Sequence, residues 1–318
     1  MAVLIPRANR FDSFDVYRTY YKKIKNHEIE VGILIPKDLK PGLHPVFVKF
    51  HGGGCVSGTW SYPDWFANWL VPLVHRNNAI VVSPNYRLLP EHTGNDIQAD
   101  LADFWTWFKN GGVTTHLATL NIPLSLDYTR VLAGGDSAGG YLALQSGLTQ
   151  PPDTIAALLG CYPMTTYLRR AQMPLFMGEP SPPASIIDAH VAALAPGTVI
   201  SGALPRPRNR ISYALFAYGR YKEFFGEGEH LWPISILSAA SPPEVMPPAV
   251  ILHGDKDTAV SIEDSRAFVE KVREVFGEGF EVRLVEREGV DHGFDMDVSE
   301  GEEWVRDVVR WVEERWIR

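Results

Sequence analysis

The run Gly-Gly-Asp-Ser-Ala-Gly-Gly at 134–140 constrains the fold of this chain more than any other segment. It follows a stretch, 128–133, that is predicted to be a short buried strand, and it precedes the predicted start of a helix at 141–146. Glycines two residues to either side of Ser137 allow a turn that is too tight for side chains. A serine held between a strand and a helix in this way is a nucleophile elbow. Because a bare G-x-S-x-G is common by chance, the strand and the helix around it carry the prediction.

Length and composition are those of a globular protein with a large core. The chain has 318 residues, of which 45% are hydrophobic and 21% are charged, and α/β chains of this length often form one domain. The formal net charge is −8 without a basic block, so nucleic acid is not expected as a partner. No apolar stretch approaches the ~20 residues needed to cross a bilayer, so no membrane span is expected.

The cysteine content points to a reducing compartment. The two cysteines, Cys55 and Cys161, exclude a disulfide framework, and we expect Cys55 to be a packing residue. The apolar run at 1–7 is too short for a signal peptide. We therefore expect a cytoplasmic protein. Its oligomeric state stays open, with a homodimer as one alternative.

Predicted strands and helices alternate along most of the chain. Strands are predicted over 28–35, 45–50, 79–83, 128–133, 155–162, 248–253 and 280–285. Helices are predicted over 95–109, from 141 onward, over 262–276 and over 302–316. This alternation predicts an α/β fold with a mainly parallel central sheet flanked by helices.

Two local features refine this picture. The early strand pair 28–35 and 45–50, joined by a short turn at 41–42, predicts an antiparallel edge. Residues 61–75 carry apolar side chains at helical spacing, and Pro72 is expected to kink or break that helix.

Residues 163–247 depart from the alternation and are predicted to be an insertion. They are rich in Pro, Met, Tyr and Ala, with helical fragments at 185–194 and 212–225 and no clear strand. We expect one α/β domain over 1–318, with 163–247 as a helical cap over Ser137. Residues 1–25, a polar and aromatic segment expected to be partly helical, are a further candidate part of the cap. Its aromatic and Met content favours an apolar acyl or aromatic pocket, although most of these side chains should pack the cap onto the core.

A serine nucleophile needs a base, and the base needs a third group to orient it. His292 follows the last predicted strand after a short loop, and it is the candidate base. Asp255 and Asp257 both follow the strand 248–253, and either could face the histidine. Asp257 is favoured because it lies further past the strand end, where Asp255 would brace the turn. The chain order serine, acid, histidine is that of nucleophile-elbow enzymes.

The segment His-Gly-Gly-Gly at 51–54 follows the strand 45–50 and offers backbone amides for an oxyanion hole. The amide of Ala138, directly after the nucleophile, would add another donor. A phosphate-binding loop would instead require a Lys-Ser/Thr pair, which is absent after these glycines. No histidine or cysteine pair has the spacing of a metal site, so neither a metal nor a cofactor is predicted.

Four motifs together resemble a known family. They are His-Gly-Gly-Gly at 51–54, Tyr-Arg-Leu-Leu-Pro-Glu-His at 86–92, Gly-Asp-Ser-Ala-Gly-Gly at 135–140 and Asp-His-Gly-Phe at 291–294. In this order they resemble the hormone-sensitive-lipase-like group of α/β-hydrolase carboxylesterases. The similarity covers roughly residues 25–318, and 163–247 is its least typical part.

The resemblance implies an α/β-hydrolase fold and an oxyanion hole made by the amides of Gly53, Gly54 and Ala138. It also implies that Arg87 and Glu91 hold loops near the site and are not catalytic. Many members carry Asp-Pro-Leu at the acid. This chain instead has a Gly-x-x-Asp-x-x-Val form at 254–260, which is found in other α/β hydrolases and favours Asp257.

These features predict a serine hydrolase that cleaves the carboxylic ester of a small, apolar or aromatic substrate through an acyl-enzyme. Ser137 would attack, His292 would carry the proton, and Asp257 would hold the imidazole. Two alternatives stay open, because fold and triad do not fix the substrate. The same triad could act on an amide, a lactone or another step of specialised metabolism, or the chain could be a non-catalytic ligand-binding relative.

Overall fold

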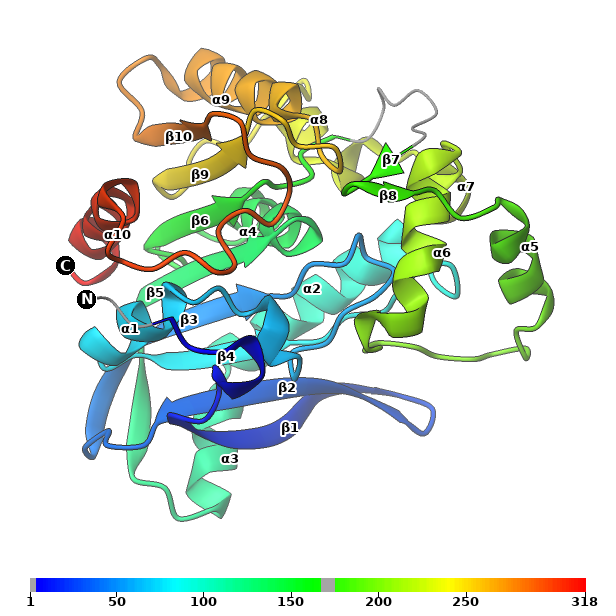
Figure 1. Ribbon diagram of the computed structural model, residues 1–318. Helices are drawn as coiled ribbons and strands as arrows, with labels where there is room; N and C mark the ends of the chain where they lie inside the picture. The colour runs from blue at the N-terminus through cyan, green and yellow to red at the C-terminus, as the bar shows by residue number, and fades with distance from the viewer. Residues whose placement is uncertain (1–3, 167–174) are drawn as a thin grey trace.

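A sheet of eight strands forms the centre of the part of the chain that the structure describes, and helices cover both of its faces (Figure 1). The computed structural model describes residues 4–166 and 175–318. The strands lie in the order β1-β2-β4-β3-β5-β6-β9-β10. Their bounds are β1 (Phe14–Ile24), β2 (His27–Pro36), β3 (Gly42–Phe50), β4 (Ile80–Pro84), β5 (Leu124–Asp136), β6 (Ala157–Cys161), β9 (Ala249–Gly254) and β10 (Val282–Arg287).

Neighbouring strands from β4 to β10 pair parallel, whereas β1, β2 and β4 pair antiparallel. The predicted sheet, mainly parallel and flanked by helices, is therefore confirmed. Because β3, β5, β9 and β10 run in the same direction, the loops that follow them meet at one edge of the sheet. Those loops carry 51–54, Ser137, Asp257 and His292.

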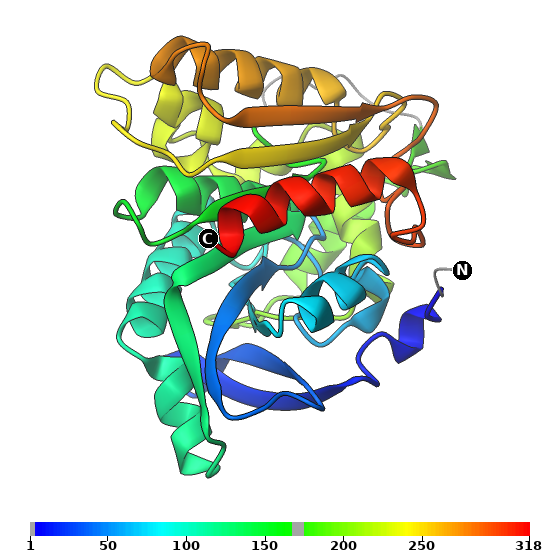
Figure 2. The same ribbon diagram turned by 90° about the vertical axis from the view of Figure 1, so that its left-hand side faces the viewer.

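Two apolar clusters lie on opposite faces of the sheet. Side chains alternate along β3, so that Phe47 joins the cluster under α1 and α10, and Val46 and Val48 join the cluster under α2, α3, α4 and α9. Figure 2 views the first face, where α10 crosses in front of the strands. The helix bounds are α1 (Leu70–Arg76), α2 (Gly94–Lys109), α3 (Gly112–Thr119), α4 (Ala138–Thr149), α9 (Ile262–Phe276) and α10 (Glu303–Trp316).

The prediction for residues 1–25 is wrong over most of its described length. After a short 3-10 turn, η1 (Arg7–Asn9), the chain forms β1, which pairs with β2 from Phe14 opposite Pro36 to Ile24 opposite His27. Tyr, Thr and Val in this stretch favour an extended strand, and the neighbouring strand supplies the backbone partners that the local pattern could not show.

The antiparallel edge exists, but it is not the pair that the sequence predicted. The expected strands are β2 and β3, and β4 lies between them. All five residues of β4 are buried, and a strand that is apolar on both sides favours an interior position with two neighbours.

The helix predicted over 61–75 is two shorter elements, η2 (Pro63–Trp65) and α1. Pro72 neither kinks nor breaks α1, because it lies in the first turn of that helix. The amides of a first turn have no partner within the helix, so proline costs no hydrogen bond there.

Residues 163–247, called the insertion below, leave the sheet after β6 and return at β9, and these two strands are neighbours. Part of the insertion lies beyond one end of the sheet, where α5, α6 and β8 stand together in Figure 1. The two-residue strands β7 and β8 were not expected from the sequence. The elements of the insertion are β7 (Leu175–Phe176), β8 (Glu179–Pro180), α5 (Ser185–Ala192), α6 (Pro205–Ala217), α7 (Tyr221–Phe225), η3 (Glu229–Leu231) and α8 (Pro233–Leu237).

A buried ion pair fastens the insertion to the core. The side chain of Glu91, only 2% exposed, accepts hydrogen bonds from Arg208 of α6 at 2.7 and 2.9 Å. Arg208 also donates to the carbonyl oxygens of Val56 and Leu89, and His190 of α5 lies 2.9 Å from the same carboxylate. The 86–92 motif thus holds the insertion beside the loop that follows β3.

Candidate active site

The elbow places Ser137 between β5 and α4 with an unusual backbone. Its φ is +55°, and its amide donates to the carbonyl oxygen of Cys161 at 2.8 Å. A methyl group at Gly135 would lie 2.5 Å from the carbonyl oxygen of Phe50, and one at Gly139 only 2.2 Å from it. Both glycines are therefore required by contact with the neighbouring strand, as the turn predicts.

The carboxylate that precedes the nucleophile is neutralised. Asp136 lies 2.8 Å from the Lys49 ammonium, and both side chains are less than a tenth exposed. The Lys49 ammonium thus offsets the negative charge of Asp136 next to Ser137.

The structure brings Asp257, rather than Asp255, to His292. His292 Nδ1 lies 2.7 Å from Asp257 Oδ2. Asp255 instead accepts from the amide of Gly289 at 2.6 Å and braces the turn after β10. Ser137 and His292 line the same cavity, so the three groups meet at the edge where β5, β9 and β10 end.

Asp257 is held as a carboxylate by its surroundings. Burial by itself raises the pKa of this carboxyl, but the charge of His292 and hydrogen bonds from His253 and His292 outweigh it. The net pKa is far below the ordinary value. The amides of Ala259 and Val260 also donate to Oδ1, at 2.8 and 2.6 Å. These bonds hold Oδ1 while His292 bonds to Oδ2, so both oxygens of the carboxylate are fixed.

His253, at the end of β9, is a residue that the sequence reasoning missed. It is fully buried, and its Nε2 lies 3.0 Å from the Val260 carbonyl oxygen and 3.3 Å from Asp257 Oδ2. Because both of these atoms are acceptors, Nε2 carries a proton. Nδ1 lies 2.7 Å from Ser265 Oγ of α9. The sequence signal that could have pointed to His253 was its place at the end of a predicted strand, four residues before Asp257.

His292 also packs on the ring of Tyr162, which is itself held by a hydrogen bond. Its imidazole lies 4.3 Å from the ring of Tyr162, centroid to centroid, and the Tyr162 hydroxyl donates to buried Asp295 at 2.7 Å. Trp69 Nε1 donates to the other oxygen of Asp295 at 3.0 Å. Tyr162 has a φ of +39°, which is rare for a bulky residue, so its backbone is strained where it supports the histidine.

The loop after β3 is a tight turn whose glycines have left-handed backbones. Gly53 has a φ of +101° and Gly54 of +65°, and a methyl group at Gly53 would lie 2.2 Å from the carbonyl oxygen of Ser57. The amides of Gly53 and Gly54 have no hydrogen-bond partner among the described residues. Ala138 begins α4, where a helical amide also lacks a partner within the helix. The three amides predicted to form an oxyanion hole therefore have no partner among the described residues.

Ser137 and His292 face a cavity of about 220 Å³. This is smaller than the ~300–1,000 Å³ of most small-molecule sites. From the insertion it is lined by Met177 and by one face of α6, whose positions at helical spacing are Asn209, Ser212, Tyr213 and Phe216. From the N-terminal segment, Arg7 lines it and pairs with Asp297. The N-terminal segment and the insertion therefore both reach the site.

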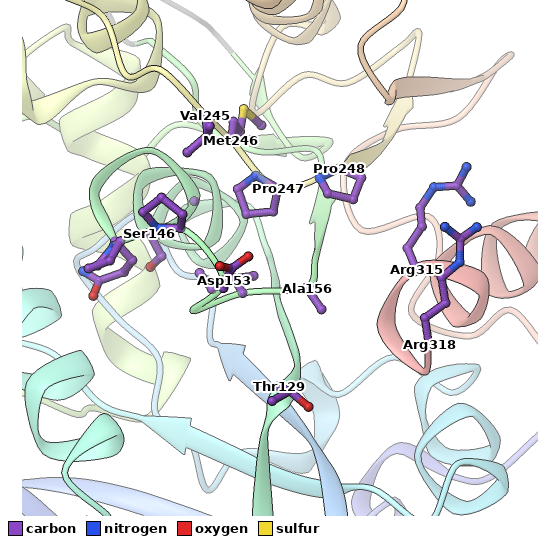
Figure 3. A pocket seen from close by; sticks show the side chains of 15 residues that line it. Thr129, Ser146, Asp153, Ala156, Val245, Met246, Pro247, Pro248, Arg315 and Arg318 are labelled. Carbon is purple, nitrogen blue, oxygen red and sulfur yellow. The ribbon is translucent and has the colours of Figure 1, made fainter.

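A larger cavity, of about 630 Å³, lies at the other end of the sheet, where Ala156 and Pro248 precede β6 and β9 (Figure 3). Asp153, Arg315 of α10 and Arg318, two residues past the end of that helix, also line it. It contains neither the elbow nor His292, so its size does not mark the catalytic site.

Within residues 4–166 and 175–318, no group of three His, Cys, Asp or Glu side chains is placed to hold a metal ion. No helix of that same part of the chain has the length and apolar character needed to cross a membrane.

Known proteins match both the sequence and the fold. A protein-family model described as the α/β hydrolase fold matches residues 47–194. The probable carboxylesterase M8 of Phoma sp. is 29% identical over 325 residues, which cover 98% of this chain and 99% of that protein. These two matches agree with the resemblance to the hormone-sensitive-lipase-like group of α/β-hydrolase carboxylesterases. The predicted carboxylesterase type is thereby confirmed.

Other relatives of this α/β hydrolase agree. The probable carboxylesterase clz11 of Cochliobolus lunatus is 28% identical over 58% of this chain and 87% of that protein. Esterase 2 of Thermogutta terrifontis, solved after phosphonylation by sarin, is 20% identical with a TM-score of 0.60, covering 94% of this chain and 93% of that one. This last likeness supports the predicted fold.

Proposed function

We propose that this α/β hydrolase cleaves a carboxylic ester through an acyl-enzyme formed on Ser137. The observation that carries the proposal is the 2.7 Å contact between His292 Nδ1 and Asp257 Oδ2, together with the cavity that both His292 and Ser137 line. A carboxylate on Nδ1 fixes the tautomer in which Nε2 is free to accept the serine proton.

In the proposed reaction, Ser137 Oγ attacks the ester carbonyl carbon as His292 Nε2 takes its proton. The resulting imidazolium is stabilised by the Asp257 carboxylate. Collapse of the tetrahedral intermediate breaks the bond to the alkoxy oxygen, which leaves as the alcohol with the proton from His292. Water, activated by the same imidazole, then attacks the acyl-enzyme and releases the carboxylic acid.

The negative charge on the carbonyl oxygen would be held by the amides of Gly53, Gly54 and Ala138. In mutated serine hydrolases, loss of one oxyanion donor costs about 10²- to 10³-fold in kcat. The neutralised Asp136 supports this assignment, because the oxyanion would otherwise form beside an uncompensated carboxylate.

We propose that the insertion caps the site and that the substrate is small. The insertion lines the cavity through Met177 and α6, and apolar Phe216 and Met296 face the same space. Esterase 2 of Thermogutta terrifontis has been solved with propionate and with butyrate bound, which supports short acyl groups here. The two cysteines are buried free thiols, which supports the proposed cytoplasmic setting.

The proposal is tested by labelling and turnover. A fluorophosphonate probe should modify Ser137, as sarin modifies the Thermogutta esterase, and p-nitrophenyl butyrate should be hydrolysed. Ser137→Ala should lose both. Labelling without turnover of any open-chain ester would favour an amide or lactone substrate. A wild-type protein that the probe does not label would favour a ligand-binding relative.

A further inference from the structure

The hydroxyl of Ser212, on α6, has no hydrogen-bond partner among the described residues. Ser212 is 4% exposed and lines the catalytic cavity. Among the described residues its Oγ has no hydrogen-bond partner, whereas Asn209 on the same helix face accepts from Ser57 Oγ at 2.8 Å. Buried polar groups in native proteins are nearly always paired, so a hydroxyl left open toward a cavity indicates a ligand or water partner.

This hydroxyl lies against residues 51–54, the proposed oxyanion loop. A methyl group at Gly54 would lie 2.8 Å from Ser212 Oγ and 2.5 Å from Phe216 Cε2. The serine and the phenyl ring one turn later therefore both contact the loop whose amides would bind the ester carbonyl oxygen. A polar atom a bond or two from that carbonyl carbon comes within reach of Ser212, and the ring restricts the space beyond it.

The sheet order indicates which half of the ester lies there. Ser137 follows β5, the 51–54 loop follows β3 on one side, and His292 follows β10 on the other. The leaving alkoxy oxygen must lie near His292, which protonates it. The acyl group accordingly lies toward Gly54 and α6.

We infer that Ser212 selects short acyl groups with an oxygen on the α-carbon, such as α-alkoxy or α-hydroxy acids. Ser212 Oγ–H donates to that oxygen, and Phe216 limits the chain beyond it. This inference rests on the proposed ester hydrolysis and specifies its substrate class. A site that hydrogen-bonds a substrate oxygen discriminates against the analogue that lacks it, because the protein group is then left unpaired.

The test uses two nearly isosteric esters, p-nitrophenyl methoxyacetate and p-nitrophenyl butyrate, in which an ether oxygen replaces one methylene. Their intrinsic reactivities differ, so the measured quantity is the ratio of their kcat/KM values in each variant. Ser212→Ala should lower the methoxyacetate-to-butyrate ratio about 3- to 10-fold, the range of one neutral hydrogen bond. Phe216→Ala should raise the rate on hexanoate relative to butyrate.

Ser238→Ala is the matched control, because Ser238 is an exposed serine of the insertion whose hydroxyl bonds to Ile234. An unchanged ratio in Ser212→Ala overturns the inference. So does an equal loss on both esters, which would make Ser212 a further oxyanion donor. If wild-type protein hydrolyses neither ester and the fluorophosphonate probe does not label Ser137, the proposed function itself fails.

Discussion

At the scale of single residues, two aspartates two positions apart have different partners. Asp257 bonds to His292 and to two amides, whereas Asp255 bonds to the amide of Gly289. Asp257→Asn should therefore lower kcat about 10³- to 10⁴-fold, because the amide favours the wrong imidazole tautomer. Asp255→Asn should stay within about 10-fold of wild type. Rates per active site, counted by fluorophosphonate titration, check both, and the reverse order would make Asp255 the acid.

His253 is proposed to position Asp257. His253→Leu removes the Nε2–H donor and should lower kcat about 10-fold, because the Asp257 carboxylate is then held less firmly against His292. The KM should change little, because His253 does not line the cavity. His253→Gln should recover part of the rate by returning an N–H donor. His44→Leu is the control, because His44 is also buried and bonds to two carbonyl oxygens, 3.0 and 2.9 Å away, far from the site. Equal kcat losses in both leucine variants would reduce His253 to a packing role.

The sequence could predict the residues whose chemistry depends on chain order. Ser137, Asp257 and His292 each follow a strand, and parallel strands bring such positions to one edge. His253 had a weak signal in the sequence, its place at the end of a predicted strand four residues before Asp257, whereas nothing in the sequence pointed to Ser212. The first looks like the last residue of a strand, and the second lies on a helix whose direction over the cavity depends on Arg208 and Glu91.

At the scale of elements, the insertion depends on the Glu91 carboxylate. Burial raises the pKa of Glu91. Hydrogen bonds and charge from Arg208 and a hydrogen bond from His190 lower it by more, so the net pKa is below its ordinary value. A folded pKa below the unfolded one, about 4.3, stabilises the fold above that value. The contribution is lost as pH falls through the lower folded pKa.

Glu91→Gln should accordingly lower the free energy of unfolding by about 3 kcal/mol at pH 7, the usual cost of breaking a buried pair. The difference from wild type should shrink as the pH falls below about 4. Thermal unfolding followed between pH 7 and pH 3 measures it. Glu223→Gln, which breaks an exposed pair with Arg220, should cost less than about 1 kcal/mol at every pH. A pH-independent difference for Glu91→Gln would contradict the assignment.

Around the proposed oxyanion loop, the atoms that a new methyl group would meet differ between Gly53 and Gly54. In Gly53→Ala the new methyl group would meet a backbone oxygen that cannot move aside, so kcat should fall at least 100-fold with the protein still folded. In Gly54→Ala the obstacles are side chains of α6, so adding Phe216→Ala should restore part of the activity. Rates on p-nitrophenyl acetate together with circular dichroism test this. Equal rescue of both alanine variants by Phe216→Ala would show that the loop itself moves.

Elements with strong local patterns were predictable, and those that depend on a distant partner were not. The bounds expected for α9 and for most of α2 agree with the structure because their apolar faces and end signals are local. β1 needed β2 to become a strand. The separation of β2 from β3 depended on β4, a strand later in the chain that is apolar on both faces.

At the scale of the whole molecule, both thiols lie inside the fold. Cys55 and Cys161 are at most 5% exposed, and burial raises the pKa of Cys55 to about 12. Neither thiol should react with a disulfide reagent until the molecule unfolds, and reductants should leave Tm unchanged. Native-state labelling should show one rate for both thiols, equal to the rate of global unfolding. Faster labelling of one thiol would reveal local opening at the oxyanion loop or behind the elbow.

The insertion leaves from β6 and returns to β9, two strands that are hydrogen-bonded neighbours. Its ends are therefore fixed side by side whatever the length of chain between them. Recombination at this junction could exchange one insertion for another while Ser137, Asp257 and His292 keep their places. Chimaeras that keep Arg208 opposite Glu91 are the ones expected to seat correctly. In such a design, the strand-end loops would keep the same reacting groups, and the exchanged insertion would change the substrate that fits the cavity.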